Sequence, residues 1–296
     1  MATMEAYKIT ALSRLFSSSV ILEMARRGKS PIFARLVREI DALGEFSACH
    51  RVRDIFDAAF NTLKRKANRH EYVYKSALTH KILLGTHSLQ TASMLTEFRV
   101  GSCKADLAIL NGTATVYEIK SERDSLSRLA TQIEAYREVF ASVYVIAGEN
   151  HLDQVIADIP SDVGVMMLHS RYRLSTLREA HNLPERTNPE AIFGSIRLDE
   201  AKAILLRNGL PVPSVPNTER FVAFKEQFVK LTPMQAHKGM VEVLKESRNL
   251  LPLSNLVSSL PISLQPAALT TSLRKVDQDR LVSAVNATTQ EAMTWA

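Results

Sequence analysis

Cysteine is scarce in this chain of 296 residues, which carries only Cys49 and Cys103. Two cysteines are too few for a disulfide framework, and these two lack the spacing of zinc ligands. The sequence therefore excludes a disulfide-stabilised scaffold and favours a reducing, cytoplasmic location.

Long apolar runs are also lacking, since none approaches the roughly 20 residues that cross a membrane. The apolar N-terminal stretch is interrupted by Arg14 and by serines, and no small-residue cleavage site follows it. This pattern is typical of an amphipathic helix rather than of a secretory signal peptide. No membrane partner is expected.

Two well-known catalytic motifs are incomplete. The letters RGKSP at residues 27–31 resemble the end of a phosphate-binding loop, but Glu23 occupies the position of its first glycine. The letters RHEYVY at residues 69–74 lack the second histidine of a zinc protease, and the eight histidines are scattered. These departures exclude a nucleotide hydrolase of the P-loop class and a zinc protease of the HExxH class.

The overall composition is that of an ordinary soluble globular protein, with 46% hydrophobic residues. The formal charge is +6 and the isoelectric point is about 9.3. A mild positive balance permits a nucleic-acid partner but does not demonstrate one. The length suits either one core with large helical additions or two to three small domains.

Helical patterns dominate residues 1–90. Ser30 and Pro31 provide an N-cap followed by proline at the first helical position, and Gly44 can end that helix. Apolar residues then recur at helical spacing, and a second such series follows. The two series are Ile32, Leu36, Val37, Ile40 and Leu43, and then Val52, Ile55, Phe56, Ala59, Phe60 and Leu63.

The pattern changes near residue 96 to short segments that alternate with the period of a strand. Three such strands are predicted first, then a helix from Ser125 to about Phe140 that Asp124 or Ser125 caps. A strand, a helix and a strand follow. The predicted ranges are 96–100, 104–110 and 115–120 for the first three strands, then 142–148, 149–159 and 163–168.

The remainder of the chain, after Tyr172, is again predicted to be helical. The candidate helices are Asp199–Asn208, Thr218–Leu231 and Pro233–Arg248. Residues 210–217 are rich in proline and are predicted to form an extended connector.

Three charged residues of the central segment carry the functional signal. Successive side chains of a strand alternate between its faces, so Glu118 and Lys120 point the same way. The preceding hairpin can bring Asp106 next to them. Two carboxylates can hold Mg²⁺, which prefers oxygen ligands, and the backbone carbonyl of Ile119 can add another. Such an ion polarises a phosphodiester, and a lysine beside it can orient water or neutralise developing charge.

The register of the hairpin decides whether these residues meet. A two-residue turn at Asn111-Gly112 would pair Leu110 with Thr113 and place Asp106 on the wrong face. A three-residue loop, 111–113, pairs Leu110 with Ala114 and therefore Asp106 with Glu118. Burial and chemistry both favour the second register. Its apolar face would consist of Ala105, Leu107, Ile109, Tyr117 and Ile119.

The spacing D-x11-E-x-K on a hairpin resembles the PD-(D/E)XK nuclease superfamily. The longer run from Lys104 to Phe140 is similar to an uncharacterised bacterial family assigned to that superfamily. Its pattern is R/K-x-D-L-A, then N-G, then Y-E-I-K-S-x-R-D-x-L-x-R-L-x-x-Q-x-x-x-Y. The resemblance covers about residues 95–170, and Lys104-Ala105 departs from it by replacing the proline that names the motif.

The resemblance implies a role for each matching residue. Asp106 and Glu118 would be metal ligands, Lys120 the catalytic lysine, and Glu97 an additional ligand. Gln132 and Tyr136 match an element on the following helix, where Gln132 joins the catalytic set. The alternative for Tyr136 is a position in the core.

A restriction-endonuclease-like α/β core with a mixed central sheet flanked by helices is the fold that the resemblance implies. The helical patterns on either side of this core divide the chain into a helical N-terminal region at 1–90, a nuclease-like core at 91–172 and a helical C-terminal region at 173–296. The implied activity is Mg²⁺-dependent cleavage of nucleic acid, with Mn²⁺ as a substitute, on DNA in preference to RNA. A phage, mobile-element or defence setting is typical of such proteins. The alternative is a silent nuclease-fold module that binds nucleic acid or a protein partner.

A second candidate nucleic-acid contact lies at residues 64–75. Five basic residues occur there together with Tyr72 and Tyr74, and such mixtures suit phosphate contact with base stacking. The alternative is a solvated helix end.

Overall fold

A computed structural model describes residues 2–41, 46 and 48–296 of the chain. The chain forms two compact units, and each unit is discontinuous in sequence. The first unit consists of residues 1–79, 170–172 and 251–296, and the second of residues 80–169 and 173–250. This division groups the two ends of the chain together, whereas the ranges 1–90, 91–172 and 173–296 are a division by sequence pattern alone.

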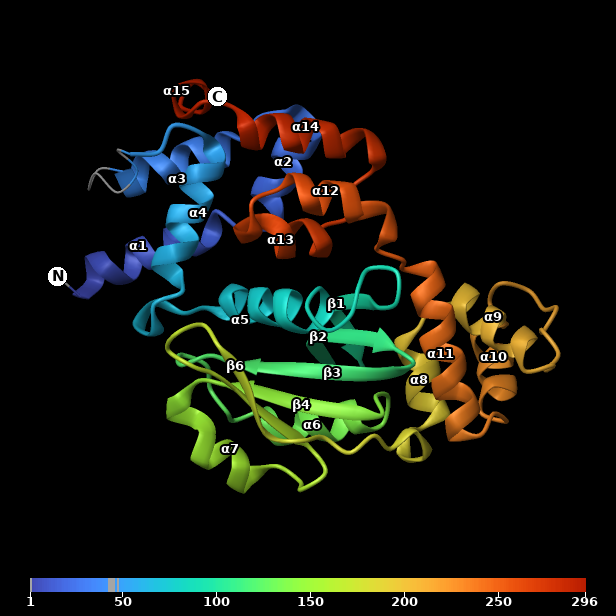
Figure 1. The fold of residues 1–296 in the computed structure, drawn as a ribbon. Coiled ribbons are helices and arrows are strands. Elements are labelled where there is room, and N and C mark those ends of the chain that lie inside the picture. Colours follow the sequence, from blue (N-terminus) through green and yellow to red (C-terminus); the bar gives the residue numbers. More distant parts are fainter. Residues whose placement is uncertain (1, 42–45, 47) are drawn as a thin grey trace. The chain divides into compact units, whose positions relative to one another are not determined.

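The first unit is helical (Figure 1). Its N-terminal helices are α1 (Ala2–Arg14), α2 (Ser18–Arg27), α3 (Pro31–Asp41), α4 (Val52–Leu63) and α5 (Glu71–Leu78). Its C-terminal helices are α12 (Ser254–Ser259), α13 (Gln265–Thr270), α14 (Lys275–Asn286) and α15 (Thr289–Ala292). Short 3-10 turns lie at Lys66–Asn68, Leu251–Leu253 and Ile262–Leu264.

Backbone hydrogen bonds hold the two ends of the chain together in this unit. The Val52 amide donates to the Ala287 carbonyl, and the Thr289 amide donates to the His50 carbonyl. The predicted start of α3 is confirmed, because the Ser30 hydroxyl accepts from the Phe33 amide at 3.1 Å. The predicted end at Gly44 lies outside the described residues.

The sequence 64–75 does not present its aromatic side chains for base stacking. Tyr74 is fully buried, Tyr72 stacks on Phe16 with ring centroids 4.5 Å apart, and Arg69 is buried. The Tyr72 hydroxyl donates to the Ser263 carbonyl within the same unit. The two tyrosines therefore pack within the unit and do not have the base-stacking role that the sequence suggested.

The second unit contains one sheet of six strands, in the order β1-β2-β3-β4-β5-β6. The strands are β1 (Ser93–Val100), β2 (Cys103–Asn111), β3 (Thr113–Lys120), β4 (Ser142–Ala147), β5 (Gly164–Leu168) and β6 (Leu174–Arg178). The first three pair antiparallel, β3, β4 and β5 pair parallel, and β6 returns antiparallel. The protein is thus a mixed α/β fold, and the predicted order of elements between residues 95 and 170 is confirmed.

Helices of the second unit follow and flank the strands (Figure 1). They are α6 (Leu129–Arg137), α7 (Leu152–Asp158), α8 (Pro189–Ser195), α9 (Leu198–Arg207), α10 (Arg220–Phe228) and α11 (Pro233–Ser247). Shorter turns occur at Thr79–Leu83, which begins at the unit boundary, and at Glu149–His151 and Pro184–Arg186. Among the described helices, none is long and apolar enough to cross a membrane.

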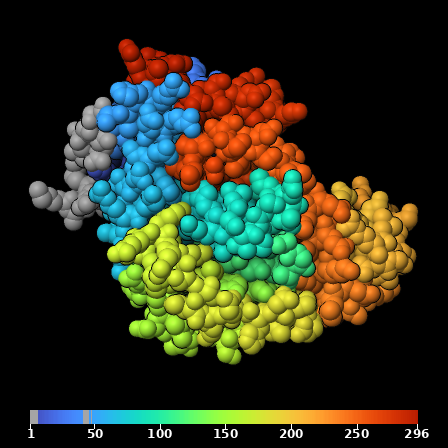
Figure 2. Space-filling view, viewed as in Figure 1, coloured from blue at the N-terminus to red at the C-terminus, as the bar shows by residue number. Residues whose placement is uncertain are grey.

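Helices α6 and α7 pack against the sheet as crossovers between parallel strands, while α8 and α11 contact β1, β2 and β3. The space-filling view shows the orange atoms of α11 adjoining the green atoms of the strands (Figure 2). One apolar cluster contains side chains from the strands, from α6 and from α8 to α11. The helices after residue 184 therefore complete the core of the sheet unit.

Two predictions about local structure are wrong. Strand β6 lies where the chain was expected to be helical, and α6 begins at Leu129 rather than at Ser125. The Asp124 carboxylate does not cap α6, because it accepts hydrogen bonds from the amide and hydroxyl of Ser121, at 2.8 and 2.6 Å. This local turn ends the strand and delays the helix.

Candidate active site

The β2–β3 hairpin has the predicted register. Leu110 pairs with Ala114, Leu107 pairs with Tyr117, and Gly112 alone separates the paired residues Asn111 and Thr113. Gly112 has a φ of +69°, a conformation that glycine adopts without steric cost. The register places Asp106 and Glu118 on one face of the sheet, as the nuclease interpretation requires.

Both faces of the hairpin are buried. The predicted apolar set is buried on one face, and Ala108, Leu110 and Val116 join the main core on the face of the acids. Leu129, Ile133 and Tyr136 of α6 belong to the same cluster. The acids therefore lie at the margin of a packed interface rather than on an open sheet surface.

The ladder between β2 and β3 ends next to Asp106. Beyond the Leu107–Tyr117 pair, the Ile119 amide donates to Asp106 Oδ2 at 2.7 Å. The side chain thus takes the place of a backbone acceptor, while β3 continues to pair with β4 as far as Lys120. The two strands separate at the site and leave Asp106 partly exposed.

Glu118 is the centre of a hydrogen-bonded network and is only 2% exposed. Lys120 Nζ donates to Glu118 Oε1 at 2.9 Å, and Gln132 Nε2 donates to the same oxygen at 2.6 Å. The Tyr136 hydroxyl donates to Glu118 Oε2 at 2.8 Å. The lysine ammonium balances the buried carboxylate charge, which would otherwise be costly.

Gln132 links the two charged residues. Its amide nitrogen donates to Glu118, and its carbonyl oxygen accepts from Lys120 Nζ at 2.9 Å. Both ends of the amide are therefore engaged, which fixes its orientation. The structure thus brings Gln132 into contact with the two charged residues with which the resemblance groups it.

Tyr136 belongs both to the core and to the site. Its ring is fully buried, and its hydroxyl also lies 3.0 Å from the Lys104 carbonyl oxygen. Burial raises the pKa of Tyr136 far above its usual range, and the charge of Glu118 raises that pKa further. The hydroxyl consequently remains protonated and acts as a donor to Glu118. Site and core were the two alternatives for Tyr136, and this side chain combines them.

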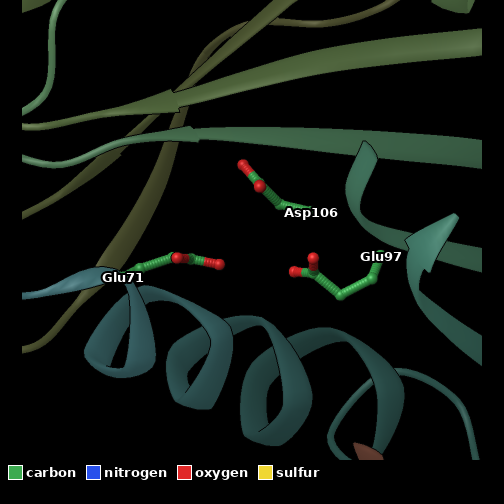
Figure 3. A group of neighbouring side chains, drawn as sticks. All are labelled: Glu71, Glu97 and Asp106. Atoms are coloured by element: carbon green, nitrogen blue, oxygen red, sulfur yellow. The ribbon is translucent and has the colours of Figure 1, made fainter. Parts of the chain in front are cut away.

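Glu97 lies opposite Asp106 on β1, between the pairs Thr96–Leu107 and Phe98–Ala105. Its φ is +54°, an unusual conformation for a residue with a Cβ. Figure 3 shows the carboxylates of Glu97 and Asp106 directed to the same side, and oxygens of the two lie within 4.8 Å. Figure 3 also draws Glu71, which lies on α5 of the first unit.

The predicted ligands do not form one tight triad, since Glu97, Asp106 and Glu118 do not all have oxygens within 4.8 Å of one another. Lys104 also enters the arrangement, because its ammonium lies 2.6 Å from Glu97 Oε2. In the sequence, Lys104 stands out only as part of the departure from the motif's proline. Lys104 lies two residues before Asp106, so the two side chains were expected on the same face of the strand. This spacing could have identified Lys104 as a neighbour of the site.

The donor set suits a hard divalent cation. Asp106 is partly exposed and Glu97 is exposed, and both offer carboxylate oxygens. A carboxylate oxygen accepts two hydrogen bonds, so Glu118 Oε1 is saturated by Lys120 and Gln132, whereas Oε2 keeps capacity beside Tyr136. Glu118 Oε2 and Asp106 are therefore the oxygens that would bind an ion.

Comparisons with known proteins identify a family and a relative of this chain. The family model described as bacteriophage P4 protein cII matches residues 64–255. Protein cII of Enterobacteria phage P4 is 29% identical over 145 residues, which are 47% of this chain and 51% of that protein. The chain thus spans about half the length of this relative.

A solved protein of unknown function from Silicibacter pomeroyi is also similar. The similarity covers 48% of this chain and 74% of that protein, at 14% identity and a TM-score of 0.25. At that score it carries no conclusion about fold or activity.

Proposed function

The chain belongs to the bacteriophage P4 protein cII family, and from this premise we propose that its sheet unit is a metal-dependent nuclease. The proposed fold type is PD-(D/E)XK, the proposed reaction is phosphodiester hydrolysis, and the proposed substrate is DNA in preference to RNA. The observation that carries the proposal is the register that aligns Asp106 with Glu118, with Lys120 bonded to the latter. A phage or mobile-element setting accords with the family.

Mg²⁺, or Mn²⁺ in its place, would polarise the phosphodiester and lower the pKa of a bound water. Asp106 and Glu118 would hold the ion, with the Ile119 carbonyl and Glu97 as further donors. This donor set consists of oxygens only, which distinguishes it from the nitrogen and sulfur sites of zinc.

Lys120 would hold the attacking water and offset charge that develops on the phosphate. Its ammonium is fixed by two acceptors, Glu118 Oε1 and Gln132 Oε1, and one of its three hydrogens remains for water or phosphate. Gln132 and Tyr136 act as positioning residues, since they contact Glu118 rather than open space. A fixed donor needs little reorganisation during the reaction, which is the main source of electrostatic catalysis.

The backbone of Glu97 supports a functional role for this region. A non-glycine residue at positive φ within a strand stores strain of about 1–3 kcal/mol. Such strain clusters at active sites, and here it directs a carboxylate toward Asp106 (Figure 3).

The alternative is a silent nuclease-fold module that binds nucleic acid or protein. The hydrogen bonds of Glu118 favour it, because Lys120, Gln132 and Tyr136 already donate to this carboxylate without an ion. The two functions differ in turnover and in the effect of metal.

The test is a nuclease panel of linear, nicked, branched and single-stranded DNA, with RNA in parallel, in Mg²⁺ or Mn²⁺. Asp106→Asn keeps the side-chain shape but removes the charge, and we expect it to abolish both metal binding and cleavage. Lys120→Met should retain metal binding and lose cleavage by about 10²-fold or more. Lys230→Met, on an exposed lysine outside the site, is the matched control.

Turnover that persists in Asp106→Asn, or in EDTA, would contradict the proposed site. Absence of turnover on every substrate with either ion would favour the silent module. Metal affinity is measured by titration calorimetry on the same samples, so that a lost ligand is separated from a lost catalytic group.

A further inference from the structure

The positive charge of the protein belongs to the first unit alone. That unit has eighteen Lys and Arg residues against eleven Asp and Glu, a net charge of +7. The sheet unit has nineteen against twenty, a net charge of −1, so the two units together give the +6 of the chain. The proposed nuclease site therefore lies in a unit that has no excess positive charge with which to attract a polyanion.

Four basic side chains of the first unit form what we call the α2 basic cluster: Arg26, Arg27, Lys29 and Arg280. Arg26 and Arg27 lie in the last turn of α2, Gly28 ends the helix with a φ of +72°, and Lys29 follows. Helix α14 lies beside α2 (Figure 1), and Arg280 Nη1 donates to the Arg26 carbonyl at 3.2 Å. The cluster thus joins two helices that are far apart in the sequence.

These cations are exposed, and three of the four have no ion-pair partner among the described residues. Arg26, Arg27 and Lys29 are all exposed, and no described residue forms an ion pair with any of them. Asp277 lies near Arg280 at 3.8 Å, but its closer partner is Arg274 at 2.8 Å. By contrast, many cations of the sheet unit, such as Lys104, Arg137 and Arg248, have acidic partners.

A purely structural role accounts for only part of the cluster. Cations in the last turn of a helix stabilise its dipole, which suits Arg26 and Arg27. Arg280 also has a structural role, because it donates to the Arg26 carbonyl at the helix end. Lys29 lies beyond the helix end and has no such role. Glu23 lies one turn earlier on α2, but its carboxylate accepts from the Ser30 hydroxyl and the Ile32 amide. Four cations at one helix end, three of them without an ion-pair partner among the described residues, are the pattern of a surface that neutralises external phosphates.

We propose that the α2 basic cluster binds the phosphate backbone of nucleic acid and so supplies affinity that the sheet unit lacks. The choice of nucleic acid among polyanions rests on the proposed nuclease function. A lipid surface fits less well, because interfacial helices expose large apolar side chains beside their cations. The buried face of α2 holds Val20, Ile21 and Met24, and no large apolar side chain of α2 is among those exposed. On α14 a single valine, Val276, is exposed, which is far less than an interfacial helix presents.

The test measures binding without catalysis. Fluorescence anisotropy with labelled duplex DNA in EDTA compares the full chain with a triple variant, Arg26→Gln, Arg27→Gln and Lys29→Gln. The control triple variant, Lys202→Gln, Lys230→Gln and Lys238→Gln, removes the same charge from exposed positions of the sheet unit. Glutamine is a good helix former, and circular dichroism checks that each variant folds.

We expect the cluster variant to bind DNA at least ten-fold more weakly at low salt. Its slope of log affinity against log salt should be shallower by about 2–3, as expected for the loss of that number of phosphate contacts. The control should match the wild type. Equal losses in the two variants, no loss in the cluster variant, or binding to phosphatidylserine vesicles but not to DNA would overturn the proposal.

Failure of this proposal is distinguishable from failure of the nuclease proposal. Binding is measured without metal. If the protein binds DNA through the cluster but never cleaves it, the proposed binding surface stands and the proposed nuclease activity is rejected. If the protein cleaves DNA and the cluster variant binds with unchanged affinity, the nuclease proposal stands and the proposed surface is rejected.

Discussion

At the scale of single residues, the pair formed by Glu118 and Lys120 combines stability with chemistry. Both side chains are buried, at 2% and 6% exposure, and their charged atoms are 2.9 Å apart. A buried pair of this kind adds little net stability compared with apolar residues, but removal of one partner leaves an uncompensated charge. An ion bound by Glu118 could replace the missing positive charge.

Lys120→Met therefore separates the metal site from a structural ion pair. In EDTA we expect this variant to lose about 3–5 kcal/mol of unfolding free energy, because the Glu118 charge is left buried and unpaired. Mg²⁺ should then raise its urea midpoint more than it raises that of the wild type. Chemical denaturation with and without Mg²⁺ measures both effects.

The matched control is Lys120→Met combined with Glu118→Gln, which removes both charges. Its unfolding should be independent of Mg²⁺ if Glu118 is a ligand. If Mg²⁺ stabilises neither variant more than the wild type, Glu118 is not a metal ligand and the silent-module alternative gains support.

At the scale of elements, the features that could be predicted were those that depend on the alternation of side chains between the two faces of a strand. The register of β2 and β3 could be derived because a shift of one residue would move every side chain to the opposite face. The start of α6 could not be derived, because Asp124 satisfies either a helix cap or the local turn with Ser121 that it forms. Strand β6 has a weak pattern, with no fully buried residue, and acquires its conformation by pairing with β5.

Close packing between β4 and β5 gives a test of the sheet itself. A Cβ atom at Gly164 would overlap the Tyr144 ring and lie 2.8 Å from the Ala180 amide nitrogen. The ring cannot move freely, because it stacks on Tyr117 and its hydroxyl donates to Glu179. We expect Gly164→Ala to cost about 1–3 kcal/mol, measured by urea unfolding.

Gly194→Ala is the control for this substitution. Gly194 lies in α8 with open space around its Cα, so alanine should raise stability by about 0.5–1 kcal/mol. A Gly164→Ala variant as stable as the wild type would show that the Tyr144 ring and the Ala180 backbone can move aside at little energetic cost.

At the scale of the whole molecule, the division into two units depends on contacts between distant parts of the chain, which no local sequence pattern predicts. The helices of residues 251–296 join the N-terminal helices through bonds such as those of Val52 and Thr289, whereas α8 to α11 join the sheet. Amphipathic periodicity predicts that a helix buries one face but not which distant partner covers it. The helices were therefore predictable as elements, and their assignment to units was not.

Tyrosines in both units make the molecule sensitive to high pH. The tyrosines whose pKa is raised are Tyr7, Tyr72, Tyr117, Tyr136, Tyr144 and Tyr172. Burial is the main cause for all but Tyr7, where the hydrogen bond to Glu39 comes first, and the pKa of Tyr172 reaches about 12. In the unfolded chain each phenol ionises near its usual pKa of about 10.

We therefore expect cooperative unfolding in alkali. Above a pH of about 10 the unfolded state loses protons that the folded state retains, so the free energy of unfolding falls as pH rises. A tyrosine that stays protonated only in the folded state contributes up to about 1.4 kcal/mol per pH unit, and less where the ring is partly exposed, as for Tyr144. Several such groups together would exhaust a typical stability of about 5–15 kcal/mol within a few pH units. Below a pH of about 10 these groups are protonated in both states and contribute no pH dependence.

The measurement is tyrosinate absorbance and circular dichroism along a pH titration, with the urea-unfolded chain as control. The tyrosinate signal should rise together with loss of helix signal, whereas a gradual titration at unchanged circular dichroism would show that the phenols ionise within the folded protein.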